Sequence, residues 1–242
     1  MPNAPIRLNT IRYLTFEINR ACPLRAQHPK CPIGHPERYR FGQQEAPLTD
    51  GLIMDFWRWC RQRDFRGIIL WHWYSEPALV LPRIRALMAR MRIEDPGQPF
   101  QLFTARQDLD LSDFDLIKIT DYDDGKELDD RIAAAFAEGD PTPHQPSGYC
   151  GRGWGWELLI DHWANWNLCC NDWRAENAVG NLWTDEWETL LRRYYAMATH
   201  LRWHDQASWE ALPRICRACM KTNFSLHRSG GSFYVPDPPR SI

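Results

Sequence analysis

Two hydrophobic patterns alternate in the first half of the chain. Runs rich in β-branched and aromatic residues, which are typical of buried strands, occur at 10–19, 67–73, 100–105 and 115–120. Between these runs, apolar residues recur at the three- and four-residue spacing of a helix face. Strands that alternate with helices predict a parallel sheet built from βαβ units, which places the chain in the α/β class. The two clearest helix faces comprise Leu52, Ile53, Phe56, Trp57 and Cys60, and Ile84, Leu87, Met88 and Met91.

The pattern changes in the second half of the chain. The strand–helix alternation ends with a helix expected at roughly 125–138. The stretch 139–148, which is rich in Pro, Gly and Ser, is typical of a linker. Two short apolar runs at 157–161 and 166–170, separated by the letters HWAN, then predict a hairpin. A helix is expected from about Thr184, because acidic residues that suit the helix dipole follow it directly.

Charge and cysteine content narrow the function. The formal net charge of the 242-residue chain is -2, with 29 basic and 31 acidic residues, so no basic field favours nucleic acid. No run of about 18 apolar residues predicts a membrane span. The first residues, MPNAPIRLNTIRYLTF, lack the long apolar region of a secretory signal, so we expect a cytoplasmic protein. Thiols stay reduced there, and the 8 cysteines then favour metal binding or catalysis over disulfides.

Cysteines in the second half have the spacing of a metal site. Cys216 and Cys219 form a C-x-x-C pair, whose two sulfurs can turn towards one metal centre. Cys150 and the adjacent Cys169 and Cys170 supply the remaining thiols of a four-ligand site. Neighbouring residues of a strand point to opposite faces, so only one of Cys169 and Cys170 should be a ligand. The alternative is that these cysteines are small buried apolar residues without a metal.

The order of these elements resembles the SPASM-type extension of radical S-adenosylmethionine (SAM) enzymes. That extension has an early Cys, a hairpin of the form I-D-x-x-G-x-V-x-x-C, a G-N step into a helix and a terminal C-x-x-C. Gly180-Asn181 supplies the G-N step here, and Cys169 matches the hairpin ligand better than Cys170. The full motif has further cysteines that this chain lacks after Cys219. The resemblance therefore implies a single auxiliary [4Fe-4S] cluster, with zinc in the same site as the alternative.

The first half resembles radical SAM barrels at four landmarks, each at the end of an expected strand. A cysteine-bearing loop follows the first strand, and the letters WYSEP after the second match the family's G-G-E-P motif without its two glycines. The letters TAR and TDYD stand where T-N-G and S-x-D are common after the third and fourth strands. The resemblance implies that these residues bind SAM. They are Trp73, Tyr74, Ser75, Glu76, Thr104 and Thr120.

The cysteine-bearing loop departs from the family pattern. The usual C-x3-C-x2-C is replaced by C-x5-H-x2-C, with Cys22, His28 and Cys31 as the candidate ligands. Imidazole can ligate cluster iron, so these three side chains could hold a second [4Fe-4S] cluster that performs radical chemistry. The alternative is that this loop has lost its cluster and that His28 is a solvated loop residue.

The resemblance also implies a domain organisation. Residues 1–140 would form a shortened partial (β/α) barrel of mostly parallel strands, with four strands where the family usually has six. Residues 150–235 would form a small Cys-rich extension, built from a β-hairpin and a helix, that holds the auxiliary cluster.

Two functions follow from the resemblance. The first is a radical SAM enzyme that cleaves SAM reductively, receives electrons from a donor protein and modifies a peptide, or else a nucleotide or small metabolite. The second is a non-catalytic scaffold of the same fold, in which a structural iron–sulfur or zinc site supports binding of a peptide or protein partner. The changed G-G-E-P motif and cluster loop favour the second function, whereas the retained Cys22, Cys31, Glu76 and Pro77 favour the first.

Overall fold

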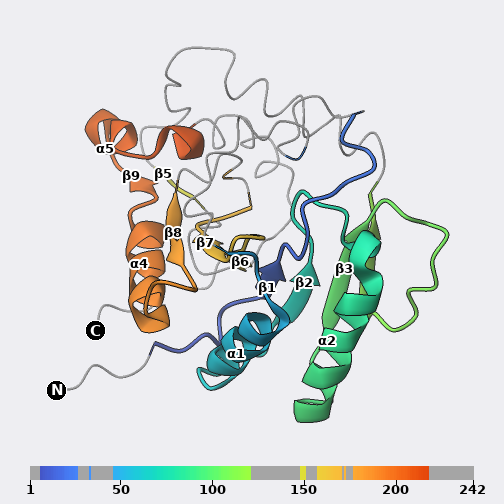
Figure 1. Ribbon diagram of the computed structural model, residues 1–242. Helices are drawn as coiled ribbons and strands as arrows, with labels where there is room; N and C mark the ends of the chain where they lie inside the picture. Colours follow the sequence, from blue (N-terminus) through green and yellow to red (C-terminus); the bar gives the residue numbers. More distant parts are fainter. Residues whose placement is uncertain are drawn as a thin grey trace.

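A seven-stranded mixed sheet lies at the centre of the computed structural model, with strand order β4-β3-β2-β1-β6-β7-β8 (Figure 1). The structure describes residues 6–26, 33, 46–120, 148–150, 157–170, 172 and 177–217. The strands of the sheet are β1 (Tyr13–Phe16), β2 (Ile68–Trp71), β3 (Phe100–Thr104), β4 (Leu116–Ile119), β6 (Glu157–Ile160), β7 (Asn165–Asn167) and β8 (Ala178–Asn181). A separate two-stranded sheet pairs β5 (Gly148–Tyr149) with β9 (Arg202–Trp203).

The helices follow the expected alternation. The α-helices are α1 (Asp50–Arg61), α2 (Leu81–Glu94), α4 (Trp187–Thr199) and α5 (Gln206–Glu210), and the short 3-10 helix η3 (Pro77–Val80) precedes α2. The four strands and two helices expected in the first 120 residues are therefore confirmed, as are the hairpin β6–β7 and the helix that was expected near Thr184. The second hairpin strand is shorter than the expected 166–170: it ends at Asn167, so Cys169 and Cys170 follow the strand and the strand argument for a single ligand between them does not apply. The helix expected at roughly 125–138 lies outside the described residues.

The sheet is mostly parallel and open. β1 pairs in parallel with β2 on one side and with β6 on the other, β3 and β4 continue the parallel part, and β7 and β8 add antiparallel strands. Within the described residues β4 and β8 form the two edges and do not pair with each other, so the sheet does not close into a barrel. The hairpin expected in the C-terminal extension thus continues the sheet of the N-terminal half directly beside β1.

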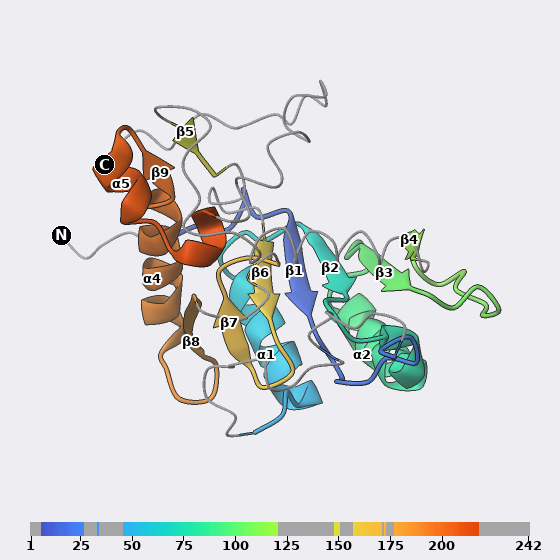
Figure 2. The ribbon, with the colours of Figure 1, turned by 90° about the horizontal axis from the view of Figure 1, so that it is seen from above.

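One face of the sheet carries the apolar core. Helices α1 and α2 lie on this face (Figures 1 and 2), and α1 starts where the Thr49 hydroxyl accepts a hydrogen bond from the Leu52 backbone at 3.2 Å. The ring of Phe56 on α1 meets Trp166 of β7 edge-on at 5.5 Å. Trp166 in turn lies 5.6 Å from Tyr194 of α4. Aromatic contacts across the core therefore join the two halves of the chain.

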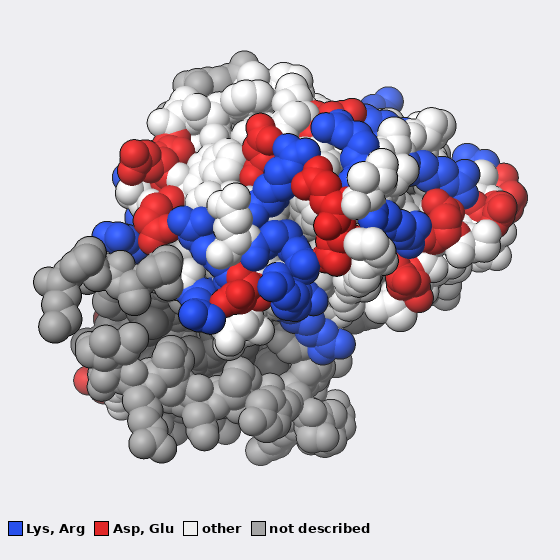
Figure 3. Space-filling view, turned by 90° about the horizontal axis from the view of Figure 1, so that it is seen from below, with Lys and Arg blue, Asp and Glu red and all other residues white. Residues whose placement is uncertain are grey.

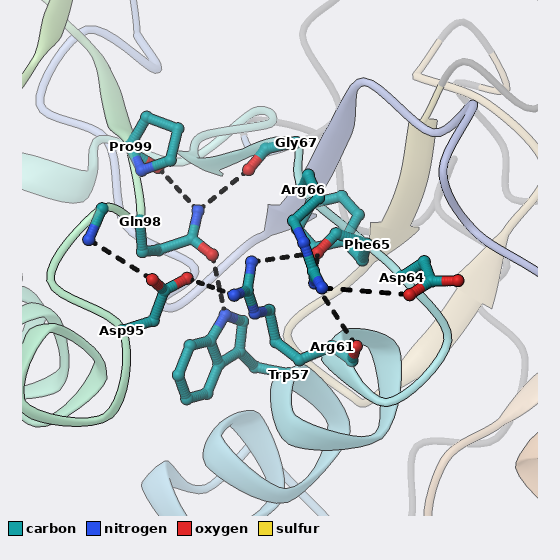
Figure 4. Close-up of polar contacts among 10 residues, drawn as sticks. Trp57, Arg61, Asp64, Phe65, Arg66, Gly67, Asp95, Gln98 and Pro99 are labelled. Carbon is teal, nitrogen blue, oxygen red and sulfur yellow. Dashed lines mark hydrogen bonds and ion pairs between the residues drawn. The ribbon is translucent and has the colours of Figure 1, made fainter.

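A buried amide connects α1 to the amino end of the sheet (Figure 4). Gln98, which is 2% exposed, accepts a hydrogen bond from the Trp57 indole at 2.9 Å and donates to the carbonyls of Gly67 and Pro99 at 2.9 and 3.0 Å. Beside it, Arg61 pairs with Asp95 at 2.6 Å. The network satisfies buried polar groups that would otherwise be costly to desolvate.

We expect the Gln98→Leu substitution to lower the free energy of unfolding by about 1–3 kcal/mol, because it leaves the Trp57 indole and a carbonyl without their partners in a buried place. Urea denaturation followed by tryptophan fluorescence measures this change. Gln206→Leu is the matched control, since Gln206 lies on an exposed helix surface and bonds only to Glu210 in the same helix among the contacts described. An equal loss in both variants would contradict the role of the network.

Charged side chains on the surface are mixed in sign. Figure 3 shows basic and acidic residues interspersed over the described part of the face seen from below. Arg58 pairs with Glu94 at 2.6 Å, and Arg85 with Asp113 at 2.9 Å. That part of the surface accordingly carries no extended field of one sign. None of the helices described has the length and apolar character needed to cross a membrane.

Candidate functional site

The expected SAM-binding residues follow neighbouring parallel strands. Because β2, β3 and β4 run in the same direction, their carboxyl ends lie at one edge of the sheet, where α/β proteins bind ligands. Residues 72–77 follow β2, Thr104 ends β3, and Thr120 follows β4. The Thr120 backbone N–H donates to the Thr104 carbonyl at 2.8 Å. This edge therefore contains all six expected SAM-binding residues.

Glu76 is the centre of a hydrogen-bonded unit at this edge. Its Oε1 accepts from the Thr104 hydroxyl at 2.6 Å and from the Ala78 backbone at 2.9 Å, where it caps η3. Its Oε2 accepts from the Ala105 backbone at 2.7 Å. Glu76 is 4% exposed, so these charge-assisted bonds act in a largely water-free place. The loop after β2 is consequently fastened to the end of β3.

The segment after β1 is attached to the same loop. The Glu76 backbone N–H donates to the Ala21 carbonyl at 2.7 Å, and the Asn19 side chain donates to the Glu76 carbonyl at 3.0 Å. Cys22 is the next residue along the chain and its thiol is half-buried. Burial raises the pKa of the Cys22 thiol, and the nearby charge of Glu76 adds to this rise. Cys22 thus stands beside the Glu76 loop, whereas His28 and Cys31 lie outside the described residues.

The other expected residues of the loop face the cysteine pair that follows β7. The Trp73 indole N–H and the Tyr74 hydroxyl both donate to the Cys170 carbonyl, at 3.2 and 3.0 Å. The two rings lie 4.7 Å apart. Both residues are buried, so they fasten the Cys169–Cys170 segment to the Glu76 loop. No sequence pattern indicated this contact, which joins residues almost 100 positions apart.

The C-terminal cysteines do not form a metal site by themselves within the part of the chain that is described. Cys150, Cys169, Cys170 and Cys216 are all half-buried and outside disulfides. Among the described residues, no three His, Cys, Asp or Glu side chains lie close enough together to hold one metal ion. Cys219 lies outside the described residues. The four-ligand cluster site, and the zinc alternative, therefore remain predictions.

The G-N step has a structural reason in this fold. Gly180 has a φ of +155°, and a Cβ atom added there would lie 2.4 Å from the Leu190 side chain of α4. The Asn181 side chain donates to the Trp163 carbonyl at 2.8 Å and to the Asn165 side chain at 2.9 Å. The step therefore allows β8 to pack closely against α4 while Asn181 holds the β6–β7 turn.

Two buried acids at this edge were not expected from the sequence. Glu17 follows β1 and Asp161 follows β6, and they are 1% and 0% exposed. Burial raises the pKa of Glu17 to about 8, and the charge of Asp161 adds to the rise. Burial also raises the pKa of Asp161, while hydrogen bonds from Asn165 oppose this. The signal that could have found them is an acid placed directly after an apolar run, as in the letters YLTFE and LLID.

The sheet face opposite the core carries further polar side chains, namely His72 directly after β2 and Gln101 near the start of β3. His72 follows β2, and its ring lies 4.8 Å from Phe103 of β3, with the Lys118 amine of β4 5.5 Å from the Phe103 ring. Burial, followed by the charge of Lys118, lowers the pKa of His72 to about 3, so its imidazole is neutral at physiological pH. The His72 Nδ1 and the Gln101 Oε1 are buried atoms that have no hydrogen-bond partner among the described residues. These two atoms could bind a polar ligand.

The comparisons with known proteins support the fold. No protein-family model matches the chain, and no curated protein is similar to it in sequence. Among solved structures it resembles "Crystal structure of BtrN in complex with AdoMet and 2-DOIA", where AdoMet is SAM. The match has a TM-score of 0.58 and 14% sequence identity, and it covers 86% of this chain and 92% of that chain. The chain shares the fold of BtrN. At this identity the likeness shows the fold alone.

Proposed function

We propose that this protein is a radical SAM-type iron–sulfur enzyme that binds SAM at the carboxyl ends of β1 to β4 and cleaves it reductively to modify a substrate. The observation that carries the proposal is the bonded unit of Glu76, Thr104 and Ala105 beside Cys22. The unit occupies the ligand-binding edge of a fold shared with a protein crystallised with SAM. A cluster-bearing cysteine next to a SAM loop is the arrangement that this chemistry needs.

The side chains after β1 have the chemistry needed to ligate an iron–sulfur cluster. Cys22 is a thiol outside any disulfide, and it would hold a [4Fe-4S] cluster together with His28 and Cys31. When bound, that cluster supplies the electron that splits SAM into methionine and a 5′-deoxyadenosyl radical. The protein's own part is to hold the loop 73–77 rigid through Glu76 and Thr104, so that SAM is bound in one orientation. Trp73 and Tyr74 fasten the Cys170 segment to this loop, where it would help to keep water from the bound SAM.

The substrate would lie against the sheet face that carries His72 and Gln101. The imidazole is neutral, and its Nδ1 and the Gln101 amide oxygen are buried without a partner in the described part of the chain. Such atoms bind hydrogen-bonding groups rather than apolar ones. A peptide backbone satisfies this requirement and is our first choice of substrate, ahead of a nucleotide or a small metabolite. A donor protein would supply the electrons. We assign no step to the C-terminal cysteines, because the described ligands do not come together there.

One observation favours the non-catalytic scaffold as the second candidate. Tyr74 and Ser75 occupy the positions of the two glycines in the G-G-E-P motif, and the Tyr74 side chain bonds to Cys170. Bulk at these positions restricts how closely a ligand can approach the loop backbone. In this alternative the loop would serve only to dock the C-terminal segment, and the protein would bind a peptide or protein partner.

Anaerobic reconstitution with iron and sulfide, followed by incubation with SAM and dithionite, separates the two candidates. For the enzyme we expect bound [4Fe-4S] clusters and release of 5′-deoxyadenosine, measured by mass spectrometry. Bound cluster and bound SAM without 5′-deoxyadenosine would contradict the enzyme and favour the scaffold. Zinc without iron in the purified protein would contradict the cluster chemistry altogether.

A further inference from the structure

Two buried carboxyl groups lie behind the loop that carries Glu76. Glu17 and Asp161 each come directly after a strand, and these strands, β1 and β6, pair in parallel with Phe16 opposite Ile160. The two acids therefore leave the sheet side by side. Both are almost fully buried, and the SAM cleavage proposed above uses neither of them. Two adjacent buried acids are costly to ionise together, so their placement calls for a physical explanation.

Glu17 bonds directly to the backbone of the proposed SAM loop. Its Oε1 accepts hydrogen bonds from the N–H groups of Tyr74 and Ser75, each at 3.3 Å. These are the residues that replace the two glycines of the G-G-E-P motif. Glu76 cannot fix this part of the loop, because its carboxylate is already bonded to Thr104 and to the Ala78 and Ala105 backbones. Glu17 is thus the acceptor for the first half of the loop, and Glu76 is the acceptor for the second.

The different environments of Glu17 and Asp161 determine which of the two carboxyl groups is protonated. Asp161 accepts bonds from the Trp163 and Asn165 backbones at 2.8 and 2.9 Å and from the Asn165 amide at 3.0 Å, which favours its charged form. Among the described residues, Glu17 accepts the long bonds from the loop and a backbone bond from His162 and feels the charge of Arg20. Burial, followed by the charge of Asp161, nevertheless raises the pKa of Glu17 to about 8. At neutral pH the proton therefore resides mainly on Glu17.

We propose that Glu17, supported by Asp161, is a positioning residue that holds the Tyr74–Ser75 backbone in the conformation that binds SAM. The proposal rests on the proposed SAM site. In this role the acid pair shapes the loop and does not touch SAM, because the buried Glu17 carboxyl contacts the loop through its backbone N–H groups.

The pair makes the loop sensitive to pH. Besides Asp161, the groups that act on Glu17 are Arg20, whose charge favours ionisation, and the His162 backbone. The His162 imidazole has a pKa lowered by burial and by the charges of Arg20 and Arg83, so it adds no charge of its own at neutral pH. Even with the favourable charge of Arg20, ionisation of Glu17 is disfavoured until about pH 8. Above that pH the second negative charge should displace the carboxylate from the loop.

The sign of the stability effect follows from linkage. The folded state keeps the Glu17 proton up to about pH 8, whereas the unfolded state releases it near 4.5, the ordinary pKa of a glutamate side chain. The folded state thus binds more protons in this window, and this group's contribution to the free energy of unfolding falls as the pH rises through it. Glu17→Gln removes this dependence, so the variant should gain stability relative to the unchanged protein between pH 5 and about pH 8.

The test measures the dissociation constant of SAM by calorimetry between pH 6.5 and 9, with the full reconstituted chain and no reductant. We compare the unchanged protein with Glu17→Gln, which keeps the carbonyl acceptor but cannot ionise, with Glu17→Ala, and with the exposed control Glu210→Gln. If only the protonated form binds, the fraction competent to bind falls about tenfold from pH 7 to pH 9, and the apparent affinity falls with it. The amino group of SAM titrates equally in all four proteins, so the difference between profiles isolates Glu17.

The inference is supported if Glu17→Gln binds SAM as tightly as the unchanged protein at pH 7 and its affinity for SAM does not show the additional decrease between pH 7 and pH 9. Glu17→Ala should bind more weakly at every pH, and Glu210→Gln should follow the unchanged protein. Identical profiles for Glu17→Gln and the unchanged protein, together with unchanged affinity in Glu17→Ala, would overturn this inference and leave the proposed function standing. No binding of SAM to the unchanged protein at any pH would overturn both. Thermal unfolding of each variant verifies that it is folded where its affinity is measured.

Discussion

The Cys22→Ala variant should release 5′-deoxyadenosine about a hundredfold more slowly than the unchanged protein, or not at all. Cys22 stands directly after the Asn19–Ala21 segment that is bonded to Glu76, so its thiol is held beside the proposed SAM loop. A thiolate is the form that ligates iron, and the raised pKa of Cys22 means that the cluster must displace a proton on binding. Reconstituted protein, SAM and dithionite, with mass spectrometry and iron analysis, provide the measurement.

Cys60→Ala is the matched control for this substitution. Cys60 lies on the buried face of α1, is 0% exposed and packs in the core, as its helical spacing indicated. Removing its sulfur should lower stability modestly by creating a small cavity, while iron content and the release of 5′-deoxyadenosine stay as in the unchanged protein. If Cys22→Ala keeps both its full iron content and its full activity, Cys22 is not a ligand and the proposed cluster loop is wrong.

The second large effect is expected for Glu76→Gln. Three donors converge on the carboxylate, namely the Thr104 hydroxyl and the backbones of Ala78 and Ala105. An amide of the same shape has one acceptor oxygen fewer, and its NH2 group then meets an N–H or hydroxyl donor in a buried place. We expect the free energy of unfolding to fall by about 1–3 kcal/mol. Because the loop loses its connection to β3, SAM should bind about tenfold more weakly, a change of about 1.4 kcal/mol.

Denaturant unfolding and calorimetry with SAM measure the two effects of Glu76→Gln. Glu94→Gln is the control, since Glu94 is a partly exposed acid at the far end of α2 that pairs with Arg58. A surface ion pair of this kind is worth at most about 1 kcal/mol, and SAM binding should not change. Equal losses of SAM affinity in the two variants would show that the Glu76 unit does not shape the ligand site.

Local pattern was sufficient for the first half of the fold and for part of the site. Apolar runs and helical spacing located β1 to β4, α1 and α2. The order of strands implied that Glu76, in the loop after β2, and Thr104, at the end of β3, lie at one edge of the sheet. Such patterns are properties of short windows of sequence, because burial on one face imposes a period on the side chains. The same is true of the β6–β7 hairpin, whose two strands are close in sequence.

What the sequence did not indicate depends on pairing between distant segments. The sequence of β6 does not indicate that this strand pairs with β1. Without that pairing, nothing suggests that Glu17 and Asp161 lie close together. The contact of Trp73 and Tyr74 with the Cys170 carbonyl is equally remote in sequence. Which distant strands pair depends on the packing of the whole sheet, and the local periodicity of the sequence does not determine it.

The central position of β1 has a consequence for how the protein is made. β1 ends at Phe16, yet its partner β6 begins only at Glu157, whose side chain accepts a hydrogen bond from Thr15 at 2.5 Å. Until about 140 further residues have left the ribosome, one edge of β1 has no strand to pair with, and such an edge can join another nascent chain. Closing so long a loop is also slow. We therefore expect folding yield to depend on chaperones that shield β1 during translation.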